Sequence, residues 1–254
     1  MSLTLKLALS PLLVAQAMRA RSRTPRLPEA AGDRHGVVGS PAALPLRLLM
    51  VGDSSAAGVG VVHQRDALAG RLPAHLAEQC GAVVRWRLIA RSGLTTAQTL
   101  QLLRREHADT PLAHADLALV VTGVNDVVEQ VPSHHAVSAR DALANWLRNG
   151  LGVQHVVFAP LPPIHHFPAL PQPLRWVAGA DARRHNRALC AWAASRADVS
   201  CVDMEMPLNR GVMASDGFHP GEPVYRYCAS AIAEHIASQV WPALAPTLHV
   251  KGTQ

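Results

Sequence analysis

The feature that most constrains the fold is an alternation, between residues 46 and 240, of short apolar runs with longer segments of helical periodicity. Such runs are typical of buried strands, and amphipathic segments between them are typical of helices that connect parallel strands. The expected strands are 46–51, 83–89, 117–122, 153–159 and 199–204, and the expected helices are 66–80, 95–107, 133–151, 180–197 and 222–240. This order predicts an α/β protein whose five-stranded parallel sheet has helices on both faces.

The chain is expected to contain one compact domain with extensions at both ends. With 49% hydrophobic and 17% charged residues, its 254 residues can bury a full core. We expect an apolar and basic N-terminal segment (1–27), a linker rich in Pro, Gly and Ala (28–44), the α/β domain (45–241) and a C-terminal tail (242–254).

The net charge of +6 comes almost entirely from the N-terminal segment. Residues 1–27 contain five basic and no acidic residues, so the remaining 19 basic and 18 acidic residues nearly cancel. A nucleic-acid-binding protein needs a basic face on its folded body. We therefore expect no nucleic-acid partner.

The N-terminal segment has three interpretations. Its apolar stretch, 3–18, is interrupted by Lys6 and Pro11, and arginines follow it at once. The stretch is shorter than the roughly 20 apolar residues that cross a bilayer. It is therefore a helix packed on the domain, an interfacial helix in peripheral contact with a membrane, or a signal peptide cleaved after the Ala-Gln-Ala at 15–17.

The four cysteines are widely spaced and form no C-x-x-C pair, which is typical of free thiols in a reducing compartment. We expect a cytoplasmic protein, with membrane association or export depending on which interpretation of residues 1–27 holds. The sequence does not indicate an oligomeric state.

Four short blocks of polar residues and glycine follow the expected strands. They are Gly52-Asp53-Ser54-Ser55, Ser92-Gly93-Leu94-Thr95-Thr96, Gly123-Val124-Asn125-Asp126 and, in the loop after the last strand, Asp216-Gly217-Phe218-His219. In a doubly wound sheet, ligands bind beyond the carboxyl ends of the strands. We therefore expect all four blocks to meet at one rim.

These residue types fit acyl transfer through a serine nucleophile. A serine hydroxyl attacks well only when an adjacent base takes its proton, and histidine is the usual base near neutral pH. We therefore assign Ser54 as nucleophile and His219 as base. Asp216, three residues before His219, is expected to orient the imidazole and to stabilise its charged form.

Acyl transfer also needs hydrogen-bond donors for the oxyanion, each contributing about 2.7–4 kcal/mol in known enzymes. The backbone N–H groups of Ser54 and Gly93 and the side-chain amide of Asn125 are the candidates. Glycine suits such a position because it has no Cβ to block a close approach. The amide of Asn125 donates without adding charge.

Each candidate also has a structural interpretation. A serine after a strand caps the next helix, glycine and asparagine occur in turns, and a histidine before proline lies in a surface loop. Four blocks in order, each after an expected strand, favour the catalytic interpretation. We expect Asp53 to bond neighbouring loop amides and Asp126 to be a turn residue.

From about residue 46 to residue 237, these blocks resemble the SGNH hydrolases, the GDSL-like lipases and esterases, in their order and spacing. The resemblance implies a three-layer α/β/α, flavodoxin-like fold and hydrolysis of esters, thioesters or acylated sugars and lipids. It implies no cofactor and no metal. The chain has no G-x-S-x-G, which excludes the nucleophile elbow of the α/β-hydrolases, and no phosphate-binding loop motif.

We therefore expect a serine esterase that cleaves carboxylic esters of small molecules. A thioesterase or a lysophospholipase would use the same residues, and a non-catalytic ligand-binding protein on this fold is the alternative from another class. Residues 160–179, with six prolines, are expected to be either a lid that forms an apolar acyl wall or a rigid surface covering.

Overall fold

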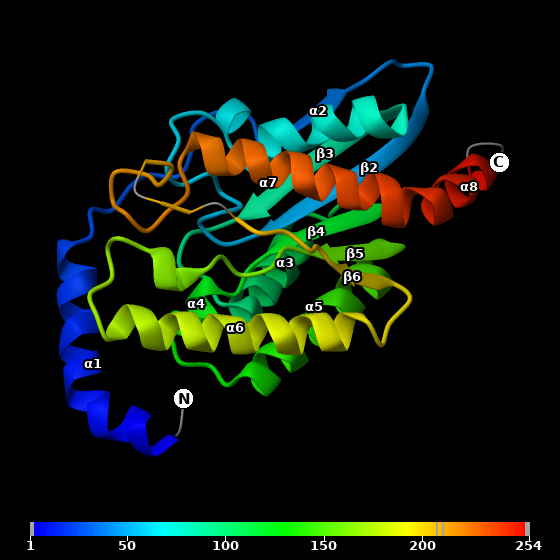
Figure 1. Ribbon diagram of the computed structural model, residues 1–254. Coiled ribbons are helices and arrows are strands. Elements are labelled where there is room, and N and C mark those ends of the chain that lie inside the picture. The colour runs from blue at the N-terminus through cyan, green and yellow to red at the C-terminus, as the bar shows by residue number, and fades with distance from the viewer. Residues whose placement is uncertain (1–2, 207, 210, 252–254) are drawn as a thin grey trace.

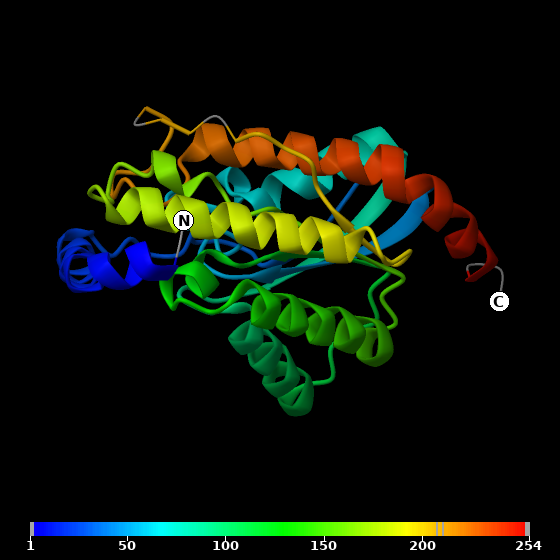
Figure 2. The same cartoon turned by 60° about the horizontal axis from the view of Figure 1, so that its bottom comes forward.

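The computed structural model describes residues 3–206, 208–209 and 211–251 and has three layers (Figures 1 and 2). A central, mostly parallel sheet is covered by helices on both faces, which confirms the predicted α/β class. Residues 1–2 and 252–254 of the expected terminal segments lie outside the described residues.

The sheet has six strands rather than the five that we predicted. Their order is β1-β3-β2-β4-β5-β6, and their bounds are His35–Val38 (β1), Leu44–Gly52 (β2), Ala82–Ala90 (β3), Leu117–Val121 (β4), His155–Phe158 (β5) and Val199–Cys201 (β6). β2 to β6 pair in parallel, whereas β1 pairs antiparallel with β3. β1 lies in the stretch 28–44, where we expected a linker. Its four residues are half-buried or exposed, so pairing with β3, rather than an apolar pattern, makes it a strand.

Without β1, the strand order is that of the flavodoxin-like fold, in which the chain switches direction beside its first parallel strand. Here that strand is β2, which lies between β3 and β4. The carboxyl end of β2 is therefore the position at which this fold opens a crevice for ligands.

Two helical layers cover the sheet (Figure 2). One layer contains α2 (Leu68–Cys80), α7 (Glu222–His235), the π-helical turn η3 (Ile236–Val240) and α8 (Trp241–Lys251). The other contains α3 (Thr96–Asp109), α5 (Ser133–Leu151) and α6 (Leu174–Ala193). Three short helices lie in connections: η1 (Gln64–Asp66), α4 (Val124–Val128) and η2 (Ile164–His166). The helix expected over 222–240 thus continues through a π turn into residues that we expected to be a tail.

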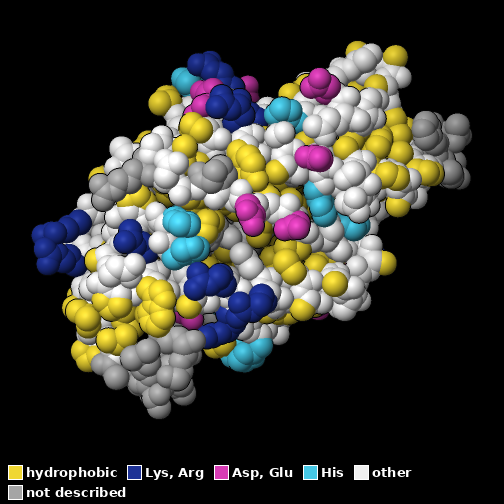
Figure 3. Space-filling view, viewed as in Figure 1, with side chains coloured by type: hydrophobic (Ala, Val, Ile, Leu, Met, Phe, Trp, Pro, Cys, Tyr) yellow, Lys and Arg dark blue, Asp and Glu magenta, His cyan; other side chains and the backbone are white. Residues whose placement is uncertain are grey.

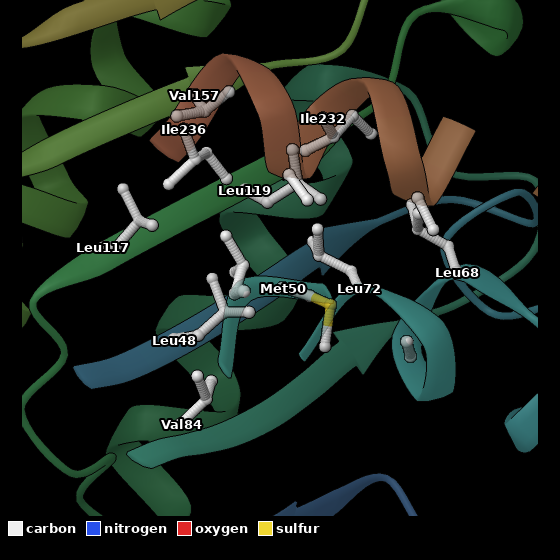
Figure 4. Close-up of a cluster of buried hydrophobic side chains, with 14 of the residues drawn as sticks. Leu48, Met50, Leu68, Leu72, Val84, Leu117, Leu119, Val157, Ile232 and Ile236 are labelled. Carbon is white, nitrogen blue, oxygen red and sulfur yellow. The ribbon is translucent and has the colours of Figure 1, made fainter. Parts of the chain in front are cut away.

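Alternate residues of the strands supply the two halves of the core. Leu48 and Met50 of β2 pack in the cluster under α2 and α7, whereas Leu49 and Val51 face the cluster under α3 and α5. Figure 4 shows the first cluster, with Ile232 of α7 among its labelled side chains. Full burial of such a side chain contributes about 1.5–3 kcal/mol, so the core fixes the strand register.

Helix α1 (Leu3–Arg23) lies at one end of the molecule, beside the start of α6 (Figure 1). The Gln16 amide donates to Gln172 O at 2.7 Å and accepts from Leu174 N at 3.0 Å, and Leu13 is buried. Apolar side chains are nevertheless visible along this helix in Figure 3, with Lys or Arg side chains at its upper end. Four of the seven large apolar side chains that are exposed in the described part lie on α1 or the start of α6: Leu12, Val14, Met18 and Trp176. In the described part of the chain, no helix is both long enough and apolar enough to cross a membrane.

Candidate active site

The loop after β2 carries Ser54 directly beyond the sheet. Gly52 ends the strand, and a Cβ at this position would lie 2.1 Å from the carbonyl oxygen of Val121 on β4, so only glycine fits. Asp53 N donates to that same oxygen at 3.1 Å, which continues the ladder by one residue. The chain then turns, with Val59 N donating to Ser54 O at 3.0 Å. Ser54 is thereby fixed at the rim where the sheet switches direction.

The loop before α7 brings an acid and a base together through its own hydrogen bonds. Asp216 Oδ1 accepts from the backbone N–H groups of Phe218 and His219, both at 2.9 Å, and Gly217 has a φ of +64° that closes the turn. Asp216 Oδ2 lies 2.6 Å from His219 Nδ1. The carboxylate therefore both shapes the loop and orients the ring.

The two loops meet, because His219 Nε2 lies 3.0 Å from Ser54 Oγ. The three side chains form one hydrogen-bonded series in which His219 is partly exposed and the Asp216 side chain is buried. Burial alone would raise the pKa of Asp216, but the hydrogen bonds from the His219 ring and from the backbone of His219 and Phe218 hold this pKa below its usual value. Asp216 is thus ionised at neutral pH, so its carboxylate can accept a hydrogen bond from His219 Nδ1.

Gly93 lies in the turn between β3 and α3 with a φ of +84°, and no atom lies within 4 Å of a Cβ added there. The left-handed backbone is a further reason for glycine at this position, beside the close approach that we expect a Cβ to block. Its neighbour Ser92 donates from both N and Oγ to Glu29 Oε1, at 2.7 and 2.8 Å. Glu29 in turn pairs with Arg34 at 2.5 Å. The segment before β1 therefore anchors this turn, which sequence spacing did not indicate.

Asn125 lies in the first turn of α4, and its amide nitrogen has two acceptors. Nδ2 donates to Leu94 O at 3.0 Å and lies 3.5 Å from Asp53 Oδ2, at the limit of a hydrogen bond. Asp53 is buried and, as expected, accepts from a loop amide, that of Ser55, at 3.0 Å. Burial raises the pKa of Asp53 to about 7, although the Ser55 hydrogen bond and His219 oppose this rise. One N–H of Asn125 is therefore held firmly and the other only weakly.

We expected Asp126 to be a turn residue, and this was wrong. Asp126 is buried and links two of the four blocks. Its carboxylate accepts from Thr96 N at 3.0 Å and from Thr96 Oγ1 at 2.7 Å, at the start of α3. The guanidinium of Arg140, which is fully buried, lies 3.6 Å from the same carboxylate. Gly123 allows this approach, because a Cβ there would lie 2.7 Å from Arg140 Nη2. No sequence signal pointed to Arg140, which lies in the middle of α5.

The proline-rich stretch 160–179 divides between the site and the second helical layer. Pro160, Pro162 and Phe167 line an apolar cavity beside Ser54 and His219. Residues from Leu174 onward belong to α6, which begins six residues earlier than predicted. In the part of the chain that the structure describes, no group of three or more His, Cys, Asp or Glu side chains could hold a metal ion.

Comparison with known proteins gives one family match. The GDSL-like lipase/acylhydrolase family matches residues 50–227, a span that includes all four blocks. No curated protein sequence matches the chain.

Solved structures with this fold include lipases and esterases. The lipase Lip_vut3 from a goat rumen metagenome has a TM-score of 0.61 at 20% identity and covers 76% of this chain and 97% of its own. A lipolytic protein of the G-D-S-L family from Veillonella parvula has a TM-score of 0.60 at 16% identity, covering 76% and 99%. A family 3 carbohydrate esterase from Clostridium thermocellum has a TM-score of 0.59 at 16% identity, covering 79% and 99%. At these identities the likeness shows the fold alone.

Proposed function

The chain belongs to the GDSL-like lipase/acylhydrolase family, and from this membership we propose that it is a serine esterase that cleaves carboxylic esters through an acyl-serine intermediate. One observation carries the proposal: Ser54 Oγ, His219 and Asp216 form a continuous series with separations of 3.0 and 2.6 Å. Both distances are within the reach that proton transfer and ring orientation require.

In the first half of the reaction, Ser54 Oγ attacks the ester carbonyl carbon while His219 Nε2 takes the hydroxyl proton. The tetrahedral intermediate then collapses, the bond between the carbonyl carbon and the alcohol oxygen breaks, and His219 returns the proton to the leaving alcohol. In the second half, His219 takes a proton from water, which attacks the acyl-serine. The acid product leaves as the proton returns to Ser54 Oγ. Asp216 stays ionised throughout and stabilises the imidazolium.

The developing oxyanion would be bound by the N–H groups of Ser54 and Gly93 and by the amide of Asn125. The firm bond from Asn125 to Leu94 O, at 3.0 Å, holds the amide in orientation. The weak contact with Asp53, at 3.5 Å, leaves its second N–H available to a better acceptor. A negatively charged oxygen in the transition state is such an acceptor, so this donor acts mainly when charge develops.

The proposal is tested by labelling and turnover of the same three proteins. Wild type, Ser54→Ala and the matched control Ser55→Ala are treated with a fluorophosphonate, and the adduct is located by intact mass and peptide mapping. Hydrolysis of p-nitrophenyl butyrate is measured in parallel, with circular dichroism as the check on folding. We expect wild type and Ser55→Ala to be labelled at Ser54 and to turn over ester, and Ser54→Ala to do neither. Ester turnover by folded Ser54→Ala would refute the mechanism, and a wild type that is neither labelled nor active would indicate a binding protein.

A further inference from the structure

The cavity beside the proposed catalytic residues is small and lies against α7. It has a volume of about 60 Å³ and begins at Ser54 and His219. On α7 it is lined by Val224, Tyr225, Cys228 and Ile232, which share one face of the helix. Its small volume therefore suits a short chain rather than a ring.

Beyond Ser54, Ser55 and His219, the walls of the cavity are mostly apolar. The ends of the central strands contribute Val121 and Ala159, and the segment between β6 and α7 contributes three methionines, Met204, Met206 and Met213. None of the described residues that line it is Lys, Arg, Asp or Glu. The hydroxyl of Tyr225, which also lines it, donates to Val59 O at 2.7 Å and so is already satisfied. Water gains few hydrogen bonds in such a space, whereas a hydrocarbon loses none.

The inner end of the cavity is closed by the core. Leu68 of α2 and Ile232 of α7 both line the cavity and belong to the buried cluster between these helices and the sheet (Figure 4). Ile232 is fully buried and Leu68 is only 4% exposed. A group that enters past Ser54 therefore meets tightly packed side chains and cannot pass through.

From this shape, and resting on the esterase function proposed above, we propose that the cavity binds a short, straight acyl chain and that butyryl esters fit it best. An apolar protein cavity of about 150 Å³ holds benzene, which has six carbons, so one of this size holds about two to three carbons. The carbonyl carbon stays outside, beside Ser54 Oγ, and the propyl group of a butyryl ester fills the cavity.

This fit predicts a steep dependence on acyl length. Each methylene that leaves water for an apolar site improves kcat/KM about fourfold, so butyrate should exceed acetate about fifteenfold. Beyond butyrate the added carbons meet the closed end or remain in water. We therefore expect kcat/KM to stop rising after butyrate and to be lower for octanoate, whose chain cannot enter without overpacking the closed end.

The experiment measures kcat/KM for p-nitrophenyl acetate, butyrate, hexanoate, octanoate and dodecanoate with four proteins. Met206→Ala removes wall volume and should move the optimum to hexanoate or octanoate. Cys228→Leu adds volume from α7 and should move the optimum to acetate. Met18→Ala is the matched control: it makes the same methionine-to-alanine change at an exposed position of α1 and should keep the wild-type profile. Because Cys228→Leu also risks overpacking, Met206→Ala decides the question if the leucine variant does not fold.

The outcomes separate this inference from the proposed function. Ser54-dependent hydrolysis that is best on octanoate or dodecanoate would overturn the short-chain assignment while leaving the esterase intact. An optimum that Met206→Ala does not move would show that the chain binds elsewhere, which also overturns it. If no ester is hydrolysed and the fluorophosphonate does not label Ser54, both proposals fail.

Discussion

Replacing Asp53 by Asn should remove part of the pH dependence of folding stability. Asp53 is 2% exposed, and burial raises its pKa from 3.8 to about 7. Between these two values the folded protein holds a proton on Asp53 that the unfolded chain has released. Stability therefore falls as pH rises through this window, because the folded state binds more protons there. Asn has nearly the same shape but no titratable proton, so the stability of the variant does not fall in this way.

The magnitude follows from the distance between the two pKa values. At about 1.4 kcal/mol for each pH unit, the cost of burying Asp53 is about 1.6 kcal/mol at pH 5 and about 4 kcal/mol at pH 8. Relative to Asp53→Asn, wild type should therefore lose about 2.5 kcal/mol between pH 5 and pH 8.

Urea unfolding of both proteins at the two pH values measures this difference directly. Asp198→Asn is the matched control, since hydrogen bonding to Arg196 lowers the pKa of Asp198. Stability from a lowered pKa is complete above the unfolded value and is lost only as pH falls through the folded value. The control should therefore differ from wild type equally at pH 5 and pH 8. If the difference in stability between wild type and Asp53→Asn is also the same at pH 5 and pH 8, the argument that burial raises the pKa of Asp53 is refuted.

Three further changes test the site and the N-terminal helix. Asp216→Asn should lower kcat by about 10⁴, because its amide can donate to His219 Nδ1 and favours the wrong tautomer; a loss below tenfold in steady-state assays would contradict the role of the carboxylate. Asn125→Ala should lower kcat by about 10²–10³ with little change in KM, whereas an effect on KM alone would make Asn125 a substrate-binding group. Deleting residues 1–27 should preserve turnover of soluble short esters while reducing co-sedimentation with anionic vesicles, since α1 has exposed apolar side chains and arginines. Full-length protein that ignores such vesicles at low salt would mean that α1 is only a docked helix.

The parts of the fold and site that could be predicted from the sequence are those whose signals are local. The buried parallel strands appear as apolar runs, and Asp216 and His219 lie three residues apart, so their pairing depends on one turn. Ser54 is placed by the end of β2. The rim then follows from sheet geometry, because parallel strands bring their following loops to one edge.

The parts that could not be predicted depend on partners far along the chain. Glu29 bonds Ser92 across 63 residues, and nothing in a stretch rich in Pro, Gly and Ala marks it as an anchor. Arg140 is buried against the carboxylate of Asp126, although arginine is among the residue types least often buried. β1 is a strand only because β3 offers it a free edge. Each depends on a tertiary neighbour that spacing does not reveal.

The two edge strands, β1 and β6, also limit aggregation through edge-to-edge strand pairing. β1 has four residues and β6 has three, against nine in β2 and in β3, so each border offers few unpaired N–H and C=O groups. A foreign strand that docked there could form only a short ladder. β1 also runs against the direction of the others, and it shields the long edge of β3, which would otherwise be the best template for fibril growth. Removing residues 35–38 should therefore lower the solubility of the protein by more than their small contribution to the core suggests.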